Sequence, residues 1–213
     1  MIPFTQDQFF EVFENYNQAV WPMQGFILAL GLLAVVFATG RFRGGHFAVS
    51  LVLSFFWIWM GVVYHFRFFS TVNRAAFFFG GLFVLEGILF LLWGLFQGKI
   101  LFRYRNDWRG LAGVMLLTYS ILAYPLLGSA LGHHYPVCPT FGLPCPTTLF
   151  TIGLLCWVEG KQVRGLLVIP LLWSLVGLGA AFSFRVFEDL GLLVAAGVGL
   201  LLLVKPGEME ESS

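Results

Sequence analysis

Charged residues are scarce in this chain. Asp, Glu, Lys and Arg together make up 11% of its 213 residues, against roughly 25% in soluble domains. Hydrophobic residues make up 59%, and the mean hydropathy is +0.86. Such a chain has too little polar surface to cover a water-soluble globule, so the sequence predicts an integral membrane protein whose surroundings are the lipid bilayer. A net charge of +1 gives no electrostatic basis for a nucleic-acid partner.

Familiar metal-binding motifs are missing as well. The chain has four histidines and three cysteines, but no HxxxH, HExxH or CxxC spacing. It has no internal repeat and no convincing inverted symmetry, which argues against a secondary transporter. Its first 20 residues contain acidic side chains and no basic n-region, so they are not typical of a signal peptide.

Six long apolar runs predict transmembrane helices, because about 20 helical residues cross the hydrocarbon core. A seventh apolar segment, 147–158, has room for only ~18 Å of helix at ~1.5 Å per residue. The seventh segment is therefore either a half-span or a span that the loop before it completes. The six long runs are 21–39, 47–65, 75–95, 111–131, 166–184 and 190–204.

The distribution of Lys and Arg predicts the orientation. With seven spans and the N-terminus outside, nine of the twelve basic residues fall on the inner side, and only Arg67, Arg74 and Arg185 lie outside. The positive-inside rule favours this arrangement. We therefore expect an all-α, multi-pass protein of a bacterial inner membrane, N-out and C-in, with one domain over residues 1–206. The acidic tail, 207–213, is expected to be disordered.

The N-terminal segment, 4–18, predicts an amphipathic helix at the outer interface. Thr5 and Gln8 have the spacing of a capping box, and the apolar residues that follow recur at helical periodicity. Helices that bind anionic lipid are normally rich in Lys and Arg, whereas this helix carries acidic residues. We expect it to dock on the protein's own outer mouth.

The stretch GHHYPVCPTFGLPCPTT, 132–148, combines four prolines with almost no charge. Its prolines exclude a regular helix, and its lack of charge is unusual for a loop in water. Non-helical backbone persists at membrane depth only where protein or a water-filled cavity satisfies its polar groups, and each proline removes one N–H donor. We expect 132–146 to be a re-entrant-like loop, recessed between helices on the outer side.

Two histidines suggest a site in this hollow. His65 lies near the outer end of the second span, and His133 begins the loop. We expect the two rings to share a small polar ligand or a proton, with Tyr64 or Asn73 within hydrogen-bonding reach, because imidazole changes charge near neutral pH. Structural hydrogen bonding is one alternative, and a metal or haem held by the same histidines is another. The candidate ligand-binding set is His65, His133, Tyr64, Asn73, Tyr135, Thr147 and Thr148, although the threonines alternatively cap the fifth helix.

Two further features have both a functional and a structural interpretation. Cys138 and Cys145 are a candidate disulfide on an oxidising outer face, and as free thiols they would suit a soft metal. Glu86 lies near the middle of the third span, where an ionisable group is costly and marks a candidate functional site. The alternative interpretation of Glu86 is a structural one, in which a protonated carboxyl group forms hydrogen bonds between helices.

Three stretches resemble the bacterial membrane family known as domain of unknown function 6064. They are FFEVFENYNQAVWPMQ, WMGVVYHFRFFSTVNRAAFFFG and GHHYPVCPTFGLPCPTTLFTIGLL. The resemblance covers nearly the whole chain and implies a multi-span membrane fold, with no assigned activity. The family pattern includes Cys145 and need not include Cys138. The other residues that the resemblance assigns to the family motif are Tyr64, His65, Asn73, Gly132, His133, Tyr135, Pro136, Pro144, Pro146, Thr147 and Thr148.

Three hypotheses about function follow from the sequence. The first is a binding or transport-related protein for a small polar ligand or a proton. The second is a haem- or metal-dependent membrane enzyme that uses His65 and His133. The third is a structural or accessory membrane subunit.

Overall fold

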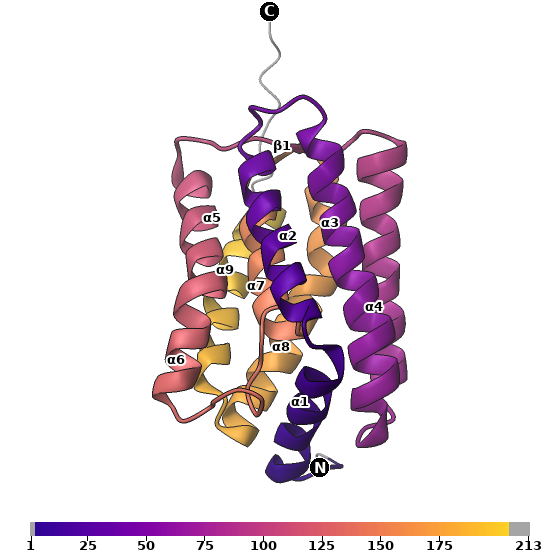
Figure 1. Cartoon of the computed structure of the whole chain (residues 1–213). Helices are drawn as coiled ribbons and strands as arrows, with labels where there is room; N and C mark the ends of the chain where they lie inside the picture. Colours follow the sequence, from indigo (N-terminus) through magenta and orange to yellow (C-terminus); the bar gives the residue numbers. More distant parts are fainter. Residues whose placement is uncertain (1–2, 205–213) are drawn as a thin grey trace, which may run out of the picture.

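The computed structural model describes residues 3–204, and within them long helices run side by side along one axis (Figure 1). Short π-helical segments extend or join these helices: η1 (Met60–Phe68) continues α3, η3 (Leu91–Phe96) continues α4, and η4 (Tyr119–Ala123) joins α5 to α6. The 3₁₀ turns are η2 (Phe69–Thr71) and η5 (Phe187–Leu190). The α-helices are α1 (Gln6–Val20), α2 (Met23–Ala38), α3 (Gly45–Trp59), α4 (Ala76–Phe90), α5 (Trp108–Thr118), α6 (Tyr124–Ala130), α7 (Pro144–Leu155), α8 (Val163–Phe184) and α9 (Gly191–Val204).

Five helical segments of the described chain are long and apolar enough to cross a membrane. The pair α1 and α2 adds a sixth when it is counted as one span, although the chain bends by 86° between them. A multi-pass helical fold is therefore confirmed, while seven spans remain a prediction that depends on α2 and on the shorter α7. The five segments are Gly45–Thr71, Ala76–Phe96, Trp108–Ala130, Val163–Phe184 and Phe187–Val204.

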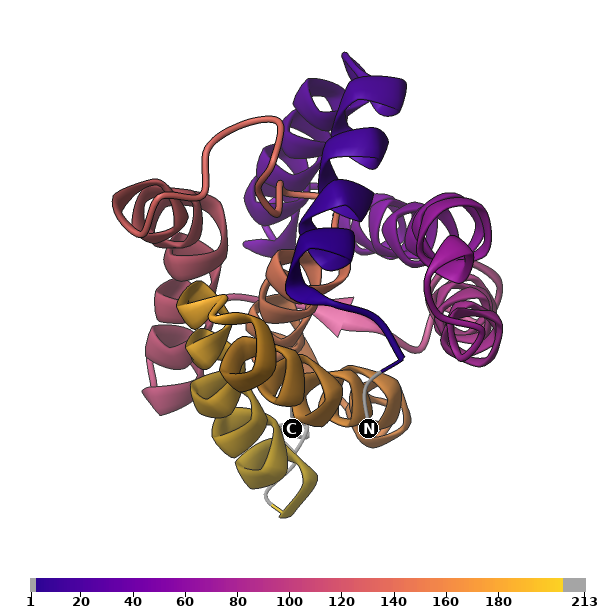
Figure 2. The ribbon, with the colours of Figure 1, turned by 90° about the horizontal axis from the view of Figure 1, so that it is seen from below.

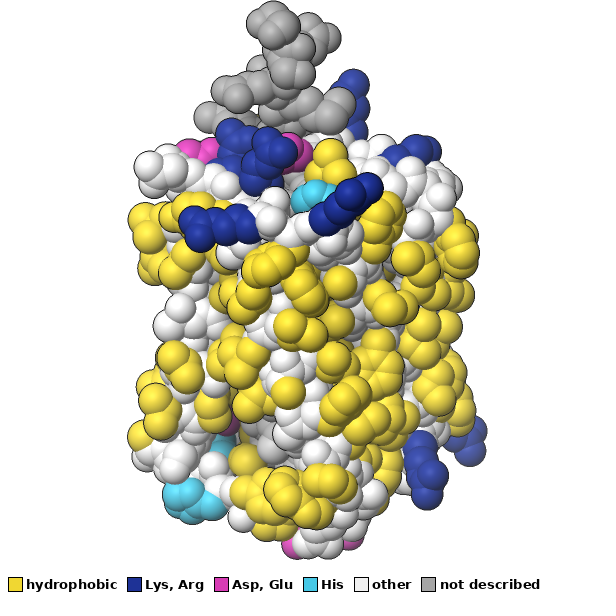
Figure 3. Space-filling view, turned by 45° about the horizontal axis from the view of Figure 1, so that its top comes forward, with side chains coloured by type: hydrophobic (Ala, Val, Ile, Leu, Met, Phe, Trp, Pro, Cys, Tyr) yellow, Lys and Arg dark blue, Asp and Glu magenta, His cyan; other side chains and the backbone are white. Residues whose placement is uncertain are grey.

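Hydrophobic side chains cover the middle of the molecule, and Lys and Arg gather mainly at one end (Figure 3). That end holds the antiparallel pair β1 (Leu101–Phe102) and β2 (Val158–Glu159), and we call it the β end. We call the opposite end, where α1 lies, the α1 end (Figure 1). An apolar belt between two more polar ends is the surface that a bilayer requires.

At the β end, Asp107 fixes the start of α5. Its carboxylate accepts hydrogen bonds from the backbone N–H groups of Arg109 (3.0 Å) and Gly110 (3.1 Å) and from Arg105 Nε (2.8 Å). Burial by itself raises the pKa of Asp107, but these hydrogen bonds outweigh it and lower the pKa overall. The ionised carboxylate thus satisfies N–H groups that the first helical turn leaves free.

The short helix α7 lies inside the bundle (Figure 2). Every residue from Pro146 to Leu155 is buried, and α7 packs against α5, α8 and α9. A Cβ added at Gly113 of α5 would lie 2.8 Å from the carbonyl oxygen of Gly153 in α7. Such close backbone approach is how small residues permit helix packing in membranes.

Helix α1 lies across its end of the bundle (Figure 2). The predicted capping box is present, because Thr5 and Gln8 exchange side-chain and backbone hydrogen bonds. The apolar stripe of α1, including Phe9 and Phe13, packs in one cluster with residues of η1, η2 and α8. The stripe therefore covers protein rather than solvent. The predicted disordered tail, 207–213, lies outside the described residues.

Candidate functional site

The irregular loop before α7 is held by one side chain of α1. Asn17 is fully buried, and its Nδ2 donates to the carbonyl oxygens of Pro136 (2.7 Å) and Cys138 (2.8 Å). Its Oδ1 accepts from Thr140 Oγ1 (2.8 Å). Asn17 thus pairs three polar groups of the loop that would otherwise be left without partners.

Two more side chains converge on the backbone of the same residue. The carbonyl oxygen of Asn17 accepts from Gln24 Nε2 (2.8 Å) and from the Tyr135 hydroxyl (3.2 Å). This polar cluster joins α1, α2 and the loop. The boundary predicted for the loop needs one correction: α7 begins at Pro144, so the last three residues of 132–146 are helical, since proline is well suited to a first helical turn.

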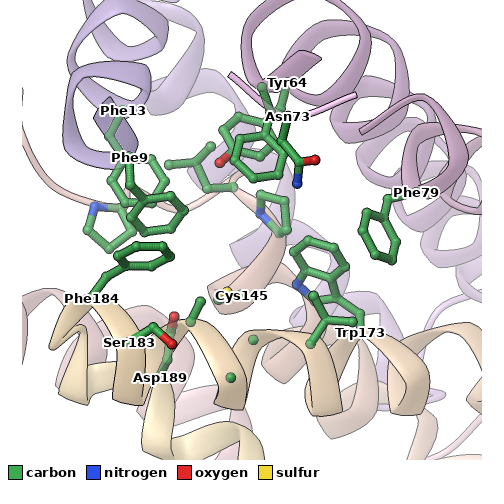
Figure 4. Close-up of a pocket in the computed structure, with 18 of the residues that line it drawn as sticks. Phe9, Phe13, Tyr64, Asn73, Phe79, Cys145, Trp173, Ser183, Phe184 and Asp189 are labelled. Carbon is green, nitrogen blue, oxygen red and sulfur yellow. The ribbon is translucent and has the colours of Figure 1, made fainter. Parts of the chain in front are cut away.

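A cavity of about 410 Å³ lies at the α1 end. Its walls come from α1, η1, α4, α7 and α8, and they consist mainly of aromatic and aliphatic side chains (Figure 4). Five residues singled out from the sequence line it, namely Tyr64, Asn73, Pro144, Cys145 and Pro146. We call it the larger cavity, in contrast to a smaller one beside the loop.

One charged side chain lines the larger cavity. Asp189 of η5 is only 2% exposed, and its Oδ1 accepts a short hydrogen bond from the Tyr124 hydroxyl. Figure 4 places Asp189 and Cys145 beside each other, with Phe9 and Phe184 on one side and Trp173 on the other. The indole Nε1 of Trp173 is buried and has no hydrogen-bond partner among residues 3–204. The cavity therefore presents a buried acceptor and a buried donor, together with the polar side chains of Tyr64, Asn73 and Ser183.

A smaller cavity of about 240 Å³ lies next to the loop. His133 and Glu188 both line it, and His133 Nδ1 lies 2.8 Å from Glu188 Oε1. Glu188 is fully buried, and its carbonyl oxygen accepts from the Tyr119 hydroxyl (2.7 Å). The consecutive acids Glu188 and Asp189 thus face two neighbouring cavities, and Tyr124, which binds Asp189, lines the smaller one.

The sequence analysis missed these acids. Glu188 and Asp189 stand between the apolar runs 166–184 and 190–204, and two adjacent acids between such runs are a signal for a buried polar site. Asn17 and Tyr124 gave no comparable signal, because an amide or a phenol in an apolar segment is common in packed helices.

His65 does not occupy the expected position. Its ring is fully buried, and neither nitrogen has a hydrogen-bond partner among the described residues. Its nearest ring contacts are Phe83 (centroids 4.6 Å apart) and Trp173 (5.1 Å). The expected hydrogen bond from Tyr64 or Asn73 is therefore wrong. Consecutive side chains on a helix point in different directions, so Tyr64 faces the larger cavity while His65 faces α4 and α8.

Two of the other predicted site residues, Asn73 and Thr147, form hydrogen bonds with backbone groups. The Asn73 side chain accepts from Ala75 N (3.0 Å) at the start of α4. Thr147 Oγ1 accepts from Gly142 N (3.2 Å). The Thr148 hydroxyl is buried and has no partner in the described part of the chain. Neither threonine lines either cavity, and α7 has no side-chain cap, so the alternative that the threonines cap this helix is not observed.

The candidate disulfide is not formed, because Cys138 and Cys145 are both free thiols. They line different cavities: Cys145 the larger and Cys138 the smaller. A soft-metal site is not assembled either, since no group of three His, Cys, Asp or Glu side chains within residues 3–204 is arranged to hold a metal ion. The same finding leaves the metal alternative for His65 and His133 without support.

Glu86 is fully buried in α4, and within the described chain neither carboxyl oxygen has a hydrogen-bond partner. The alternative of a carboxyl hydrogen-bonded between helices is therefore not observed. Glu86 lines neither cavity.

Replacing Asn17 with leucine tests the role of this side chain in holding the loop. The carbonyl groups of Pro136 and Cys138 would lose their donors, at roughly 1–3 kcal/mol for each unpaired buried group. We expect the free energy of unfolding, measured by steric trapping in micelles, to fall by ~2–4 kcal/mol. Asn15→Leu is the matched control, because Asn15 is exposed on the same helix. Equal stability of both variants would contradict this role.

Alkylation of Cys138 tests its surroundings. Burial, and next the charge of Glu188, raise the pKa of Cys138 from 9.0 to about 11. Because only the thiolate reacts, iodoacetamide should modify Cys138 at pH 8 ~100-fold more slowly than an ordinary thiol, and the rate should rise ~tenfold per pH unit until about pH 11. Peptide mass spectrometry measures the rate, with Asn15→Cys as an exposed reference thiol. A plateau of the Cys138 rate below pH 9 would disprove the shift.

Comparison with known proteins identifies a family and no relative of known function. A model described as "Family of unknown function (DUF6064)" matches residues 6–211. Searches of curated proteins and of solved structures gave no match. The match includes the loop, α1 and all residues that line the two cavities except Pro3 and Phe4, in agreement with the resemblance carried by the three stretches. The chain therefore belongs to the DUF6064 family.

Proposed function

We propose that this protein spans a bacterial inner membrane seven times, N-out and C-in, and binds a small molecule in the larger cavity at its outer end. The orientation is supported by the nine-to-three division of Lys and Arg and by the concentration of these residues at the β end (Figure 3). In this arrangement the β end faces the cytoplasm, and α1 lies at the outer interface.

The short helix α7 is the weakest of the seven spans. Its twelve residues cover only ~18 Å at ~1.5 Å per residue. The loop before it supplies the missing length, and the hydrogen bonds from Asn17 to Pro136 and Cys138 allow irregular backbone below the membrane surface.

The larger cavity is the observation that supports binding. Its volume of about 410 Å³ falls within the ~300–1,000 Å³ typical of ligand sites, which combine apolar walls with a few polar groups. Asp189, Asn73 and Trp173 provide such groups. His65 lines neither cavity, and His133 is engaged by Glu188. The larger cavity thus offers recognition groups rather than a histidine acid or base.

Alkaline phosphatase fusions test the orientation, because this reporter is active only outside the cytoplasm. Fusions after Val72 should be active, and fusions after Gly98 and Lys161 should be inactive. The positions follow from alternate crossings by α3, α4, α5–α6 and α7. Activity at Lys161 would contradict a crossing by α7.

Substitution of Gly179 tests binding in the larger cavity. Gly179 lines this cavity, and a Cβ added there meets no atom within 4 Å, so the backbone accepts a side chain at this position and we expect Gly179→Leu to narrow the cavity. Native mass spectrometry of protein purified in a maltoside should find a bound small molecule in the wild type and little of it in Gly179→Leu.

Gly197→Leu is the matched control for this experiment. Gly197 is also exposed on a helix, and a Cβ there likewise meets nothing within 4 Å, but it lies on α9 away from the cavity. This variant should retain the molecule. A wild-type protein without a bound molecule, or equal occupancy in the two variants, would contradict the proposal.

A further inference from the structure

The larger cavity has a chemical character that restricts its ligand. Aromatic rings from several elements surround it, including Phe9, Tyr64, Trp173 and Phe184. Phe9 and Phe184 stack with ring centroids 4.7 Å apart. Aromatic faces carry partial negative charge, so they attract cations and disfavour anions.

Asp189 adds an ionisable carboxyl group to these walls. It is the only Asp, Glu, Lys, Arg or His among the described residues that line the cavity. No ion pair within residues 3–204 involves it. Its hydrogen bond from the Tyr124 hydroxyl stabilises the carboxylate but supplies no counter-charge. Burial without a counter-charge disfavours the ionised carboxylate, and a bound cation would favour it.

A bound cation would satisfy both features. We infer, building on the binding function proposed above, that the larger cavity takes a small organic cation, an amine or a quaternary ammonium with an apolar body. Its charged head lies at Asp189, and its apolar part contacts the rings of Phe9 and Phe184. Quaternary ammonium groups are recognised in this way by aromatic cages in other proteins.

A metal ion fits the cavity less well than an organic cation. Hard cations such as Ca²⁺ need six or more oxygen ligands, whereas Asp189 is the single carboxylate on the wall. No group of three metal-binding side chains is assembled in the described chain. The volume of about 410 Å³ also suits an organic molecule.

Titration calorimetry in dodecylmaltoside micelles, which are uncharged, tests the charge selectivity. The four probes share one hexyl chain: hexylamine, hexyltrimethylammonium, hexanol and hexanoate. We expect both cations to bind at least ~10-fold more tightly than the neutral and anionic probes, a difference of ~1.4 kcal/mol or more. Equal or tighter binding of hexanol or hexanoate overturns the inference.

Asp189→Asn tests whether the Asp189 carboxylate binds the cation. Asparagine keeps the shape of the side chain and an acceptor for the Tyr124 hydroxyl, but it cannot carry a negative charge. This variant should lose at least ~10-fold in affinity for both cations, and unchanged affinity overturns the inference. If Asp189→Asn does not fold, Gly179→Leu provides the second measurement, since it leaves Asp189 intact. It should weaken cation binding, whereas Gly197→Leu should not, and equal binding to both variants likewise overturns the inference.

A competition experiment distinguishes two sources of the cation, an amine lipid headgroup and a free amine. Displacement of hexylamine by phosphatidylethanolamine in mixed micelles, but not by phosphatidylglycerol, assigns the site to an amine lipid headgroup. Displacement by neither lipid assigns it to a free amine. A co-purified neutral or anionic molecule that is lost in Gly179→Leu would overturn the inference about charge while leaving the binding function standing.

Discussion

Backbone that leaves its helical path inside a helical bundle needs partners for its carbonyl groups, and Asn17 provides them. Its amide binds the carbonyls of Pro136 and Cys138, while its own carbonyl accepts from Gln24 and Tyr135. One side chain thereby connects α1, α2 and the loop. This connection adds to the packing of the apolar stripe of α1, which also gives the larger cavity part of its aromatic wall. The same helix thus satisfies the polar groups of the loop and borders the cavity.

Buried charge is the second constraint. Glu188 and Asp189 are consecutive and almost completely buried, although each carboxylate is costly in a low-dielectric surrounding. The fold gives them different partners: His133 binds Glu188, and Tyr124 binds Asp189. Neighbouring side chains on the 3₁₀ turn η5 point in different directions. Glu188 therefore lines the smaller cavity, and Asp189 lines the larger one.

Two of the π-helical segments, η1 and η4, lie close to these groups. η1 contains Tyr64 and His65, and η4 contains Tyr119 and immediately precedes Tyr124. A π-helical turn contains more residues than an α-helical turn, so it changes the direction in which the following side chains point. Such segments occur frequently at functional sites. Here they turn Tyr64 toward the larger cavity and bring Tyr119 and Tyr124 to the two acids.

The sequence alone determined the membrane-protein class, the positions of the long helices and the capped helix α1, because hydropathy and capping patterns act over short distances. It also marked Tyr64, Asn73 and Cys145, which line the larger cavity. Only the tertiary structure separated His65 from the expected hydrogen bonds, left Cys138 and Cys145 unpaired, and joined Asn17 to a loop about 120 residues away. The direction of a side chain and its distant partner depend on how the helices pack, and a local pattern of residues carries no information about that packing.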